Sequence, residues 1–250
     1  MFENVSEYGL LGGTGFLCGF LYLLFRFRDK EKRENAVYIY VFSALFAMLF
    51  AKLLYLLVNL KDIIDVIKAT SQYKALAFVL IRGGFVFYGG LIGALTGFYV
   101  MIRYFGLKSE EYMPLMVPCI PLVHGFGRIG CHLVGCCYGR ITSSHFAITY
   151  TDSLYAPNGV NLIPVQIIEA VFVFILFIIL FVMGFKERLK GFILPVYLVS
   201  YSLFRFVMEY FRGDELRGIW GPFSTSQWIS IVVFILGAFL IIRHISKRPV

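Results

Sequence analysis

The sequence predicts an all-α integral membrane protein that crosses the bilayer about seven times. Of its 250 residues, 59% are hydrophobic and only 15% are charged, whereas a soluble domain carries about 25% charged residues. Apolar runs of about 18 residues or more, the length that spans a bilayer, recur along the whole chain. The composition therefore excludes a water-soluble globule, a disordered chain and a disulfide-rich scaffold.

Seven apolar runs define the predicted crossings. The first, residues 8–25, follows a segment with acids and no Lys or Arg, so we expect a retained helix rather than a cleaved signal peptide. The other six cover residues 36–60, 76–102, 113–134, 165–185, 191–210 and 226–242. Because no linker or repeat separates them, the chain is predicted to form a single domain, residues 1–250.

The distribution of basic residues predicts the orientation. The loops 26–34, 103–111 and 186–190 and the tail 243–250 hold 13 Lys and Arg, whereas the segments on the opposite side hold 6. Because cytoplasmic loops collect Lys and Arg, we expect the N-terminus outside and the C-terminus inside. The net charge of +8 then reflects topology and predicts no nucleic-acid partner. Residues 61–75, on the exported side, have the spacing of a short interfacial amphipathic helix.

Four basic residues fall inside the apolar runs: Lys52, Arg82, Arg128 and Arg205. A charge at this depth costs about 2.5–3.5 kcal/mol, so such residues normally face a cavity or a partner. Only two acids, Glu169 and Glu209, lie within the runs. The excess of cations predicts that an anion enters the bundle, although Lys52 and Arg82 have the alternative of snorkelling to an interface.

Several of these charged residues are spaced to share helix faces. Arg205, Glu209 and Arg212 are separated by four and three residues, which places them on one face of the sixth helix. We expect Glu209 to neutralise one arginine and to leave the other for a ligand. Gln166 and Glu169 share a face of the fifth helix in the same way. Because guanidinium groups bind phosphate through bidentate forks, the predicted ligand is a phosphate; a purely structural ion-pair network is the alternative.

Glycines mark the third and fourth crossings. Gly89, Gly93 and Gly97 form small-xxx-small steps that allow close helix packing. The pairs at 83–84 and 89–90 favour a broken helix or a ligand that approaches the backbone, and packing alone is the alternative. In the fourth crossing, glycines bracket Arg128 and three prolines precede them, which predicts an irregular helix beside a polar cavity.

Five motifs follow one another in a recognisable order. They are Tyr-Gly-Leu from Tyr8, Gly-Gly-Leu-Ile-Gly from Gly89, Gly-Arg-x-Gly around Arg128 with Gly135 and Gly139 after it, Pro-x-Gln-x-x-Glu at 164–169, and Phe-Arg-x-x-x-Glu-x-x-Arg at 204–212. In these motifs, and in Gln227 before the last helix, the chain resembles the bacterial phosphatidylglycerol–prolipoprotein diacylglyceryl transferase family. The resemblance covers nearly the whole chain.

The chain departs from the family pattern at five positions. Tyr88 and Ile163 stand where the family has histidines, and Lys52 stands where it has an arginine. Cys131 replaces an asparagine and Cys136 replaces an acid. The phosphate-handling residues are therefore retained, whereas the proton-handling residues are altered.

The resemblance implies a transfer from phosphatidylglycerol to the lipobox cysteine of a prolipoprotein signal peptide. The cysteine thiolate attacks a glycerol carbon, forms a thioether and expels glycerol phosphate, whose charge Arg128 and Arg205 are expected to stabilise. No cofactor is expected. The residues expected to bind substrate are Tyr8, Lys52, Gly89, Gly90, Gly127, Gly130, Gly139, Gln166, Glu169, Glu209 and Arg212.

The thiol proton needs an acceptor, and the sequence offers two side chains. Tyr88 is a poor base at an ordinary phenol pKa, so we expect it to position the substrate. His124, one helical turn before Arg128, has a more suitable pKa. A helix–helix hydrogen bond is the alternative role for His124, and release of the proton to water stays open.

The segment Cys131-His132-x-x-x-Cys136-Cys137 is the remaining cluster of reactive side chains. Apolar packing, a disulfide or redox role, and a metal site are the three interpretations. Because a second ligand cluster is lacking, we expect no metal.

Two further functions stay open beside the leading one. A related enzyme would move a phosphatidylglycerol-derived group to another acceptor, and an anion transporter would use the same arginines. A transporter is expected to show internal pseudo-symmetry, which the sequence lacks. The expected location is the bacterial plasma membrane, where the chain is a multi-pass protein in contact with the lipid bilayer.

Overall fold

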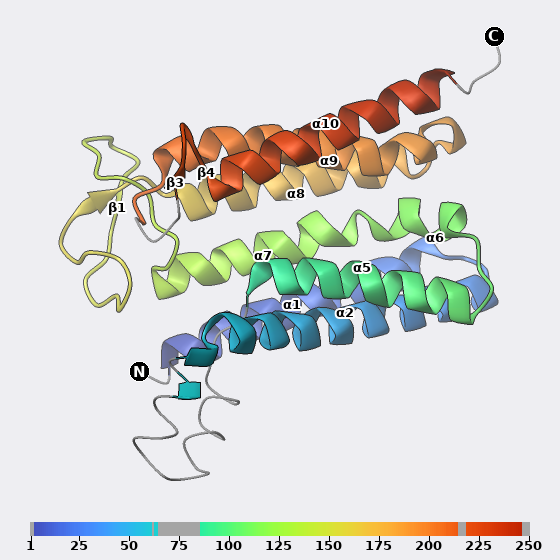
Figure 1. Cartoon of the computed structure of the whole chain (residues 1–250), viewed down its shortest axis with the longest axis horizontal. Helices are drawn as coiled ribbons and strands as arrows, with labels where there is room; N and C mark the ends of the chain where they lie inside the picture. Colours follow the sequence, from blue (N-terminus) through green and yellow to red (C-terminus); the bar gives the residue numbers. More distant parts are fainter. Residues whose placement is uncertain (1–2, 62, 65–85, 215–218, 247–250) are drawn as a thin grey trace. The chain divides into compact units, whose positions relative to one another are not determined.

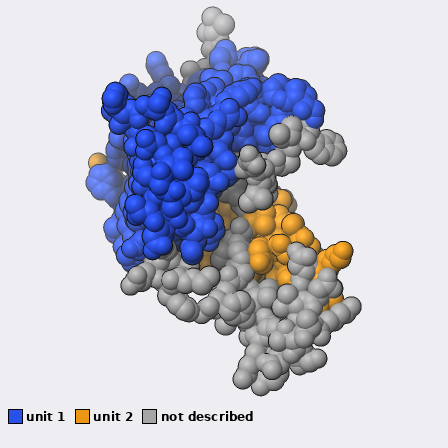
Figure 2. Space-filling model, turned by 90° about the vertical axis from the view of Figure 1, so that its left-hand side faces the viewer, with its two compact units in different colours: residues 1–26, 110–250 blue, residues 27–109 orange. Residues whose placement is uncertain are grey.

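Figure 1 shows the computed structural model, an assembly of long helices with two short hairpins. It describes residues 3–61, 63–64, 86–214 and 219–246. The chain divides into two compact units, residues 27–109 and residues 1–26 together with 110–250, which Figure 2 distinguishes by colour. The two units are described separately below. The expectation of a single domain stays a prediction.

Eight α-helices account for most of the described residues. They are α1 Glu3–Arg26, α2 Lys30–Val58, α5 Phe87–Tyr104, α6 Ser109–Met116, α7 Cys119–Val134, α8 Val165–Met183, α9 Ile193–Met208 and α10 Thr225–Ser246. Within the described ranges, six helical stretches are long and apolar enough to cross a membrane: Glu7–Arg26, Lys30–Val58, Ser109–Val134, Val165–Met183, Glu187–Phe211 and Thr225–Ser246. The all-α, multi-pass fold class is therefore confirmed, and the orientation stays a prediction.

The sequence of α8 shows how the larger unit is built. One stripe of the helix is buried: Gln166, Glu169, Val173, Leu176 and Leu180. These positions recur every three or four residues, the period of one helix face. The opposite stripe, which includes Val171, Ile175 and Ile178, is more than half exposed, as expected of side chains that contact lipid. The buried stripe is polar near the start of α8 and apolar towards its end. Polar groups of this unit therefore gather at the end where α8 begins.

The apolar end holds the core of this unit. Val117, Leu176, Leu180 and Ile193 pack together from the α6–α7 junction, α8 and α9. Close approach of α7 to its neighbours depends on small residues. A side chain at Gly125 would meet the ring of Phe174 in α8, and one at Gly15 would lie 3.0 Å from Phe126 Cβ. Shape complementarity at these contacts fixes the positions of the polar residues one to three turns away.

Two predicted crossings are interrupted. The crossing expected at 113–134 begins earlier, at Ser109, and breaks between Met116 and Cys119, where Pro118 cannot continue the hydrogen-bond ladder of α6. The crossing expected at 191–210 consists of a 3₁₀ turn, Glu187–Phe192, then α9, then a second 3₁₀ turn, Glu209–Phe211. The sequence periodicity located both spans but not their breaks.

Two antiparallel hairpins lie beside the polar end of the helices (Figure 1). Strand β1, Ile148–Thr149, pairs with β2, Asn161–Leu162, and strand β3, Ile219–Trp220, pairs with β4, Phe223–Ser224. An isolated bridge joins Gly139 to Arg212. The loop after α7 is thereby tied to the chain after α9.

The second unit is built on α2 and α5. The helices pack through Gly89, Gly93 and Gly97, because a side chain at each would collide with the backbone of α2. The small-xxx-small prediction is confirmed for these positions. The predicted interfacial helix at 61–75 falls mostly outside the described residues. Arg82 and the glycine pair at 83–84 lie outside them entirely.

Candidate active site

Arg128 lies at the centre of a buried network that joins α7 to α8. Its Nε atom is 3.0 Å from Glu169 Oε2 and donates a hydrogen bond of 3.1 Å to His124 Nε2. Glu169 is only 2% exposed and accepts a second hydrogen bond from the hydroxyl of Tyr201 in α9, at 3.3 Å. The Tyr201 ring packs edge-on against the His124 ring. Three helices therefore hold one arginine in a single orientation and leave its terminal nitrogens without a hydrogen bond to the described residues.

The contact with Arg128 defines the protonation of His124. Arg128 Nε has a hydrogen to donate and no lone pair to accept one, so His124 Nε2 accepts. A neutral ring then carries its proton on Nδ1. Glu169 Oε1 lies 3.5 Å from the same Nε2 atom and cannot receive a proton from it in this arrangement. In this state the basic nitrogen of His124 is occupied.

Arg205 is the second buried arginine of this unit. Its Nη2 atom lies 2.8 Å from Glu209 Oε2 and donates to Ser226 Oγ at 3.2 Å. Its Nη1 atom is buried and has no hydrogen-bond partner among the residues that the structure describes. An unpaired buried donor costs about 1–3 kcal/mol, which makes Nη1 a candidate contact for a bound acceptor.

Arg212 differs from the prediction. The expectation that it shares a helix face with Arg205 is wrong, because α9 ends at Met208 and Arg212 has an extended backbone. It forms a bidentate pair with Asp214, with Nε···Oδ1 2.9 Å and Nη2···Oδ2 2.7 Å. Burial alone would lower the pKa of Arg212, but the hydrogen bonds and charge of Asp214 hold it above its ordinary value.

Asp214 was missed by sequence reasoning. The signal that would have found it is an acid two residues after an arginine at a helix end. Because Arg212 pairs with Asp214, the expectation that Glu209 leaves this arginine free is also wrong. Arg128, Arg205 and Arg212 each have an acidic partner. Unpaired donors, rather than an excess of positive charge, therefore favour a bound anion.

The loop after α7 is held against this network by backbone contacts. Arg140 N donates to Phe211 O at 2.9 Å, and Gly213 N donates to Tyr138 O at 3.0 Å. Gly139 lies between them, and a side chain there would come within 2.8 Å of Ile163 Cβ. The close approach explains the glycine without assigning it a direct contact with substrate.

Gln166 connects the start of α8 to the same loop. Its Nε2 atom donates to Cys136 O at 2.9 Å and to the hydroxyl of Tyr150 at 3.3 Å. Because these contacts fix the amide orientation, its buried Oε1 atom is the one left without a partner. Burial raises the pKa of Tyr150 to about 12, so the phenol stays protonated and donates to His132 O at 3.0 Å. Gln166 therefore offers one buried acceptor, at the start of α8, that has no partner among the described residues.

Tyr8 and two glycines complete the candidates of this unit. The Tyr8 ring lies over Gly130, where a side chain would come within 2.8 Å of its Cδ2 atom. Gly127 faces open space. Tyr8 also interacts electrostatically with Arg128, so α1 brings a phenol to the same region.

Four predicted site residues belong to the unit 27–109. Lys52 lies with its Nζ atom 5.4 Å from the centre of the Tyr55 ring. Tyr88 and Gly89 lie in the first turn of α5, and Gly89 packs against α2. Gly90 is in ordinary contact with Ala51. The side chain of Tyr88 lies outside the described part of the structure.

The chain is similar to known proteins along nearly its whole length. The family described as "Prolipoprotein diacylglyceryl transferase" matches residues 2–243. A Clostridium perfringens protein named phosphatidylglycerol–prolipoprotein diacylglyceryl transferase 2 is 36% identical over 95% of this chain and 90% of its own length. A transferase of the same name, without the number, from Clostridium tetani is 32% identical over 95% of this chain and 92% of its own length. One from Geobacter sulfurreducens is 32% identical over 69% of this chain and 66% of its own length. The chain belongs to the prolipoprotein diacylglyceryl transferase family.

Proposed function

We propose that this chain transfers the diacylglyceryl group of phosphatidylglycerol to the lipobox cysteine of prolipoproteins, in the bacterial plasma membrane. Family membership, the names of its relatives and the six membrane-capable helices support the activity and the membrane location. The lipobox cysteine as acceptor and the roles of individual residues are parts of the proposal.

The unpaired Nη1 atom of Arg205 is the observation that carries the proposal. Nη2 is held by Glu209 and Ser226, so the guanidinium plane is fixed while Nη1 remains to be bonded. A phosphate oxygen supplies the missing acceptor and a charge-assisted hydrogen bond. Because the donor is already oriented, little reorganisation is needed when charge develops on the leaving group.

Arg128 contributes the second guanidinium. Its Nε atom is used by Glu169 and His124, which leaves both terminal nitrogens for a ligand. Glu169 interacts electrostatically with both Arg128 and Arg205, so the two cations act on the same region. One phosphate that contacts both arginines would satisfy donors from α7 and α9 together.

The reaction joins sulfur to carbon at the expense of a carbon–oxygen bond. The acceptor thiolate attacks the glycerol carbon that carries the phosphate ester, and the electron pair of the broken C–O bond leaves with glycerol phosphate. The products are the thioether-linked diacylglyceryl peptide and glycerol phosphate. The negative charge that develops on glycerol phosphate falls on the oxygens that Arg128 and Arg205 are proposed to bind. The thiol proton leaves separately.

His124 is better placed to orient Arg128 than to accept that proton, because its Nε2 atom already accepts a hydrogen bond from Arg128. Water then takes the proton, either at the site or when the acceptor thiol ionises before the attack. Tyr88 retains the positioning role proposed from its sequence context. Gln166 Oε1, a buried acceptor without a donor, suits a hydroxyl of the glycerol headgroup.

The direct test is transfer by the purified full-length chain in nanodiscs. Phosphatidylglycerol and a lipobox peptide are supplied, and the product is identified by the mass of an added diacylglyceryl group. Phosphatidylethanolamine replaces phosphatidylglycerol in the donor control, and a Cys→Ser peptide replaces the acceptor. Transfer only with both native substrates supports the proposal. Absence of transfer with an active relative assayed in parallel contradicts it.

A second acceptor deserves a parallel assay because Tyr88, Cys131, Cys136 and Ile163 depart from the family pattern. The same nanodiscs, with radiolabelled phosphatidylglycerol and a bacterial membrane extract, identify any other labelled product. Restoration of growth in a strain that lacks its transferase separates the two activities, since only prolipoprotein lipidation restores it. Release of an enclosed anion from sealed vesicles without product would favour transport instead.

A further inference from the structure

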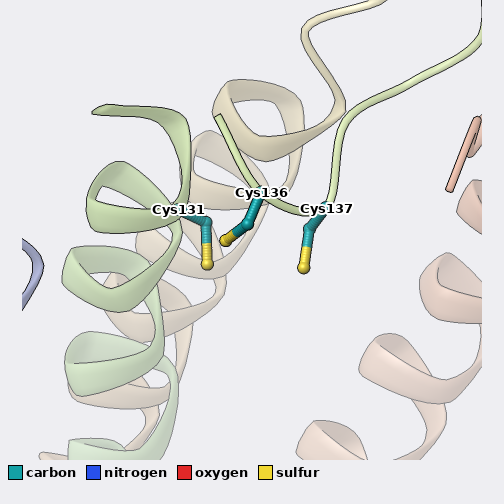
Figure 3. A group of neighbouring side chains, drawn as sticks. All are labelled: Cys131, Cys136 and Cys137. Atoms are coloured by element: carbon teal, nitrogen blue, oxygen red, sulfur yellow. The ribbon is translucent and has the colours of Figure 1, made fainter. Parts of the chain in front are cut away.

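Three cysteine side chains meet at the end of α7. Cys131 lies in the last turn of the helix, and Cys136 and Cys137 lie in the segment that follows (Figure 3). The three Sγ atoms all lie within 4.8 Å of one another. Cys131 is buried, and the other two are half-buried. The proposed transfer does not use these thiols.

The backbone is shaped to bring the sulfurs together. Gly135 ends α7 with a φ of 80°, a left-handed conformation that reverses the chain within one residue. Cys137 has a φ of 60°, and among the described residues it is the one non-glycine with a positive φ. Such a conformation costs about 1–3 kcal/mol in a non-glycine residue and persists only where the surroundings impose it.

Contacts from distant elements hold this geometry. Gln166 Nε2 binds the carbonyl of Cys136 at 2.9 Å, and Gly139, two residues after Cys137, is bridged to Arg212. The cluster is therefore fixed at both ends by α8 and by the chain after α9. Apolar packing alone does not require a strained cysteine whose sulfur lies within 4.8 Å of two others.

Positive charge surrounds the cluster. Arg128 and Arg212 both interact electrostatically with the Cys137 thiol, and Arg128 also with Cys131. An ion bound by three thiolates carries a net negative charge, which these two guanidinium groups help to stabilise although each also pairs with an acid. The same arginines would have no such role beside three neutral thiols.

We propose that Cys131, Cys136 and Cys137 form a binding site for one thiophilic d¹⁰ metal ion, of the class of Zn(II) or Cu(I). Thiolates select these ions over hard cations. With a Zn–S bond of about 2.3 Å, three sulfurs arranged trigonally lie about 4.0 Å apart, within the observed spacing. Binding displaces the protons of the three thiols, so the protein releases protons as it takes up the ion. This proposal departs from the expectation, drawn from the sequence, that the chain holds no metal.

A disulfide explains fewer of the observations. Pairing any two of the cysteines leaves the third sulfur without a role, although it also lies within 4.8 Å of both. It also needs an external oxidant, whereas metal binding needs only the ion and reduced thiols. We therefore assign the whole cluster to one ion.

The test titrates Cd(II), a spectroscopic probe for thiolate sites, into the reduced full-length protein in detergent. One equivalent should produce cadmium–thiolate charge-transfer absorption and release protons into a weakly buffered solution. Cys137→Ser should weaken binding by more than about 100-fold, since changes that only touch a ligand indirectly already cost 10–100-fold. Cys18→Ser, outside the cluster in α1, is the matched control and should bind Cd(II) as the unaltered chain does.

A second measurement uses the unaltered chain and does not depend on how the variants fold. Each cysteine is alkylated with and without Cd(II), and the modified peptides are quantified by mass spectrometry. Protection of Cys131, Cys136 and Cys137 but not of Cys18 supports the site. Absence of one-equivalent binding, equal binding in Cys137→Ser, or a disulfide within a chain that binds no Cd(II) after reduction overturns it. None of these readouts requires lipid transfer, so failure of the proposed activity does not affect them.

Discussion

Arg205 and Glu209, one helical turn apart, form a buried ion pair that uses only one of the arginine's terminal nitrogens. The Nη2···Oε2 distance is 2.8 Å, and Nη1 is left buried without a partner. The acid therefore orients the guanidinium group without saturating it. An arginine held in this way differs from a surface arginine, because the cost of immobilising it is met before a ligand arrives.

Replacement of Arg205 by lysine should impair transfer nearly as much as replacement by alanine. Lysine keeps the charge but cannot pair with Glu209 and bind phosphate through a planar fork. We expect turnover to fall by about 10²–10³-fold, the usual cost of one preorganised donor. Transfer to a lipobox peptide in nanodiscs measures it, with Arg243→Lys at an exposed position of α10 as the control. Unaltered transfer by both Arg128→Ala and Arg205→Ala would contradict the phosphate site.

His124→Gln separates a positioning role from a basic one. Glutamine keeps an acceptor for Arg128 Nε but cannot take up a proton at neutral pH. If His124 positions Arg128, we expect a loss of about 10-fold, the value of a weakened hydrogen bond, and a larger loss in His124→Ala. The pH dependence of turnover should be the same as in the unaltered chain. His145→Gln, at an exposed loop position, is the control. Equal inactivation of His124→Gln and His124→Ala would assign the base to His124.

Asp214→Asn should destabilise the loop that carries Arg212. The substitution removes the charge that balances a guanidinium with only 4% of its side chain exposed, while keeping the volume. Removing one member of a buried pair costs about 3–5 kcal/mol of folding free energy. Because Asp214 is partly exposed, we expect a loss of stability near the lower value. The midpoint of thermal unfolding in detergent should fall accordingly. Asp152→Asn, in the exposed β1–β2 loop, is the control. An unchanged midpoint for Asp214→Asn would show that the pair is dispensable.

Tyr150 predicts how stability changes in alkali. Burial raises its pKa to about 12 in the folded chain, against 10.0 for an unperturbed phenol, so the folded state holds this proton more tightly. The resulting stabilisation is fully present below pH 10 and is lost as pH rises towards 12. Unfolding midpoints at pH 8, 10 and 11 should fall more steeply in the unaltered chain than in Tyr150→Phe. Tyr155→Phe, an exposed tyrosine, should follow the unaltered chain. Parallel curves for all three proteins would contradict the assignment.

The orientation inferred from 13 against 6 basic residues is open to a direct test. A reporter that is active only in the cytoplasm should be active when it is fused after Val250, and a reporter that is active only on the exported side should be inactive there. In the exposed loop near Phe146 the expected result is the reverse: the reporter that works on the exported side should be active, and the cytoplasmic one should be inactive. The opposite pattern for either fusion would overturn the predicted topology.

The helices and the family could be predicted because their determinants are local in the sequence. A run of apolar residues long enough to span a bilayer specifies a helix wherever the rest of the chain lies, since an unpaired backbone is too costly in lipid. The motifs around Arg128, Glu169 and Arg205 were recognisable for a related reason: each lies within one short stretch of the sequence. The departures at Tyr88, Cys131 and Cys136 were also visible at this level.

The sequence alone thus determined the fold class and the approximate positions of the membrane-capable helices, and it marked the arginines that are proposed to bind phosphate. Only the tertiary structure decided the partners. Arg212 pairs with Asp214 because α9 ends before Arg212. The basic nitrogen of His124 is occupied because Arg128, which lies between His124 and Glu169 of α8, donates a hydrogen bond to it. The three cysteines meet because the chain reverses at Gly135 and Cys137. Such contacts depend on helix ends and on interhelical packing, which are set by the whole chain rather than by the periodicity of any one segment.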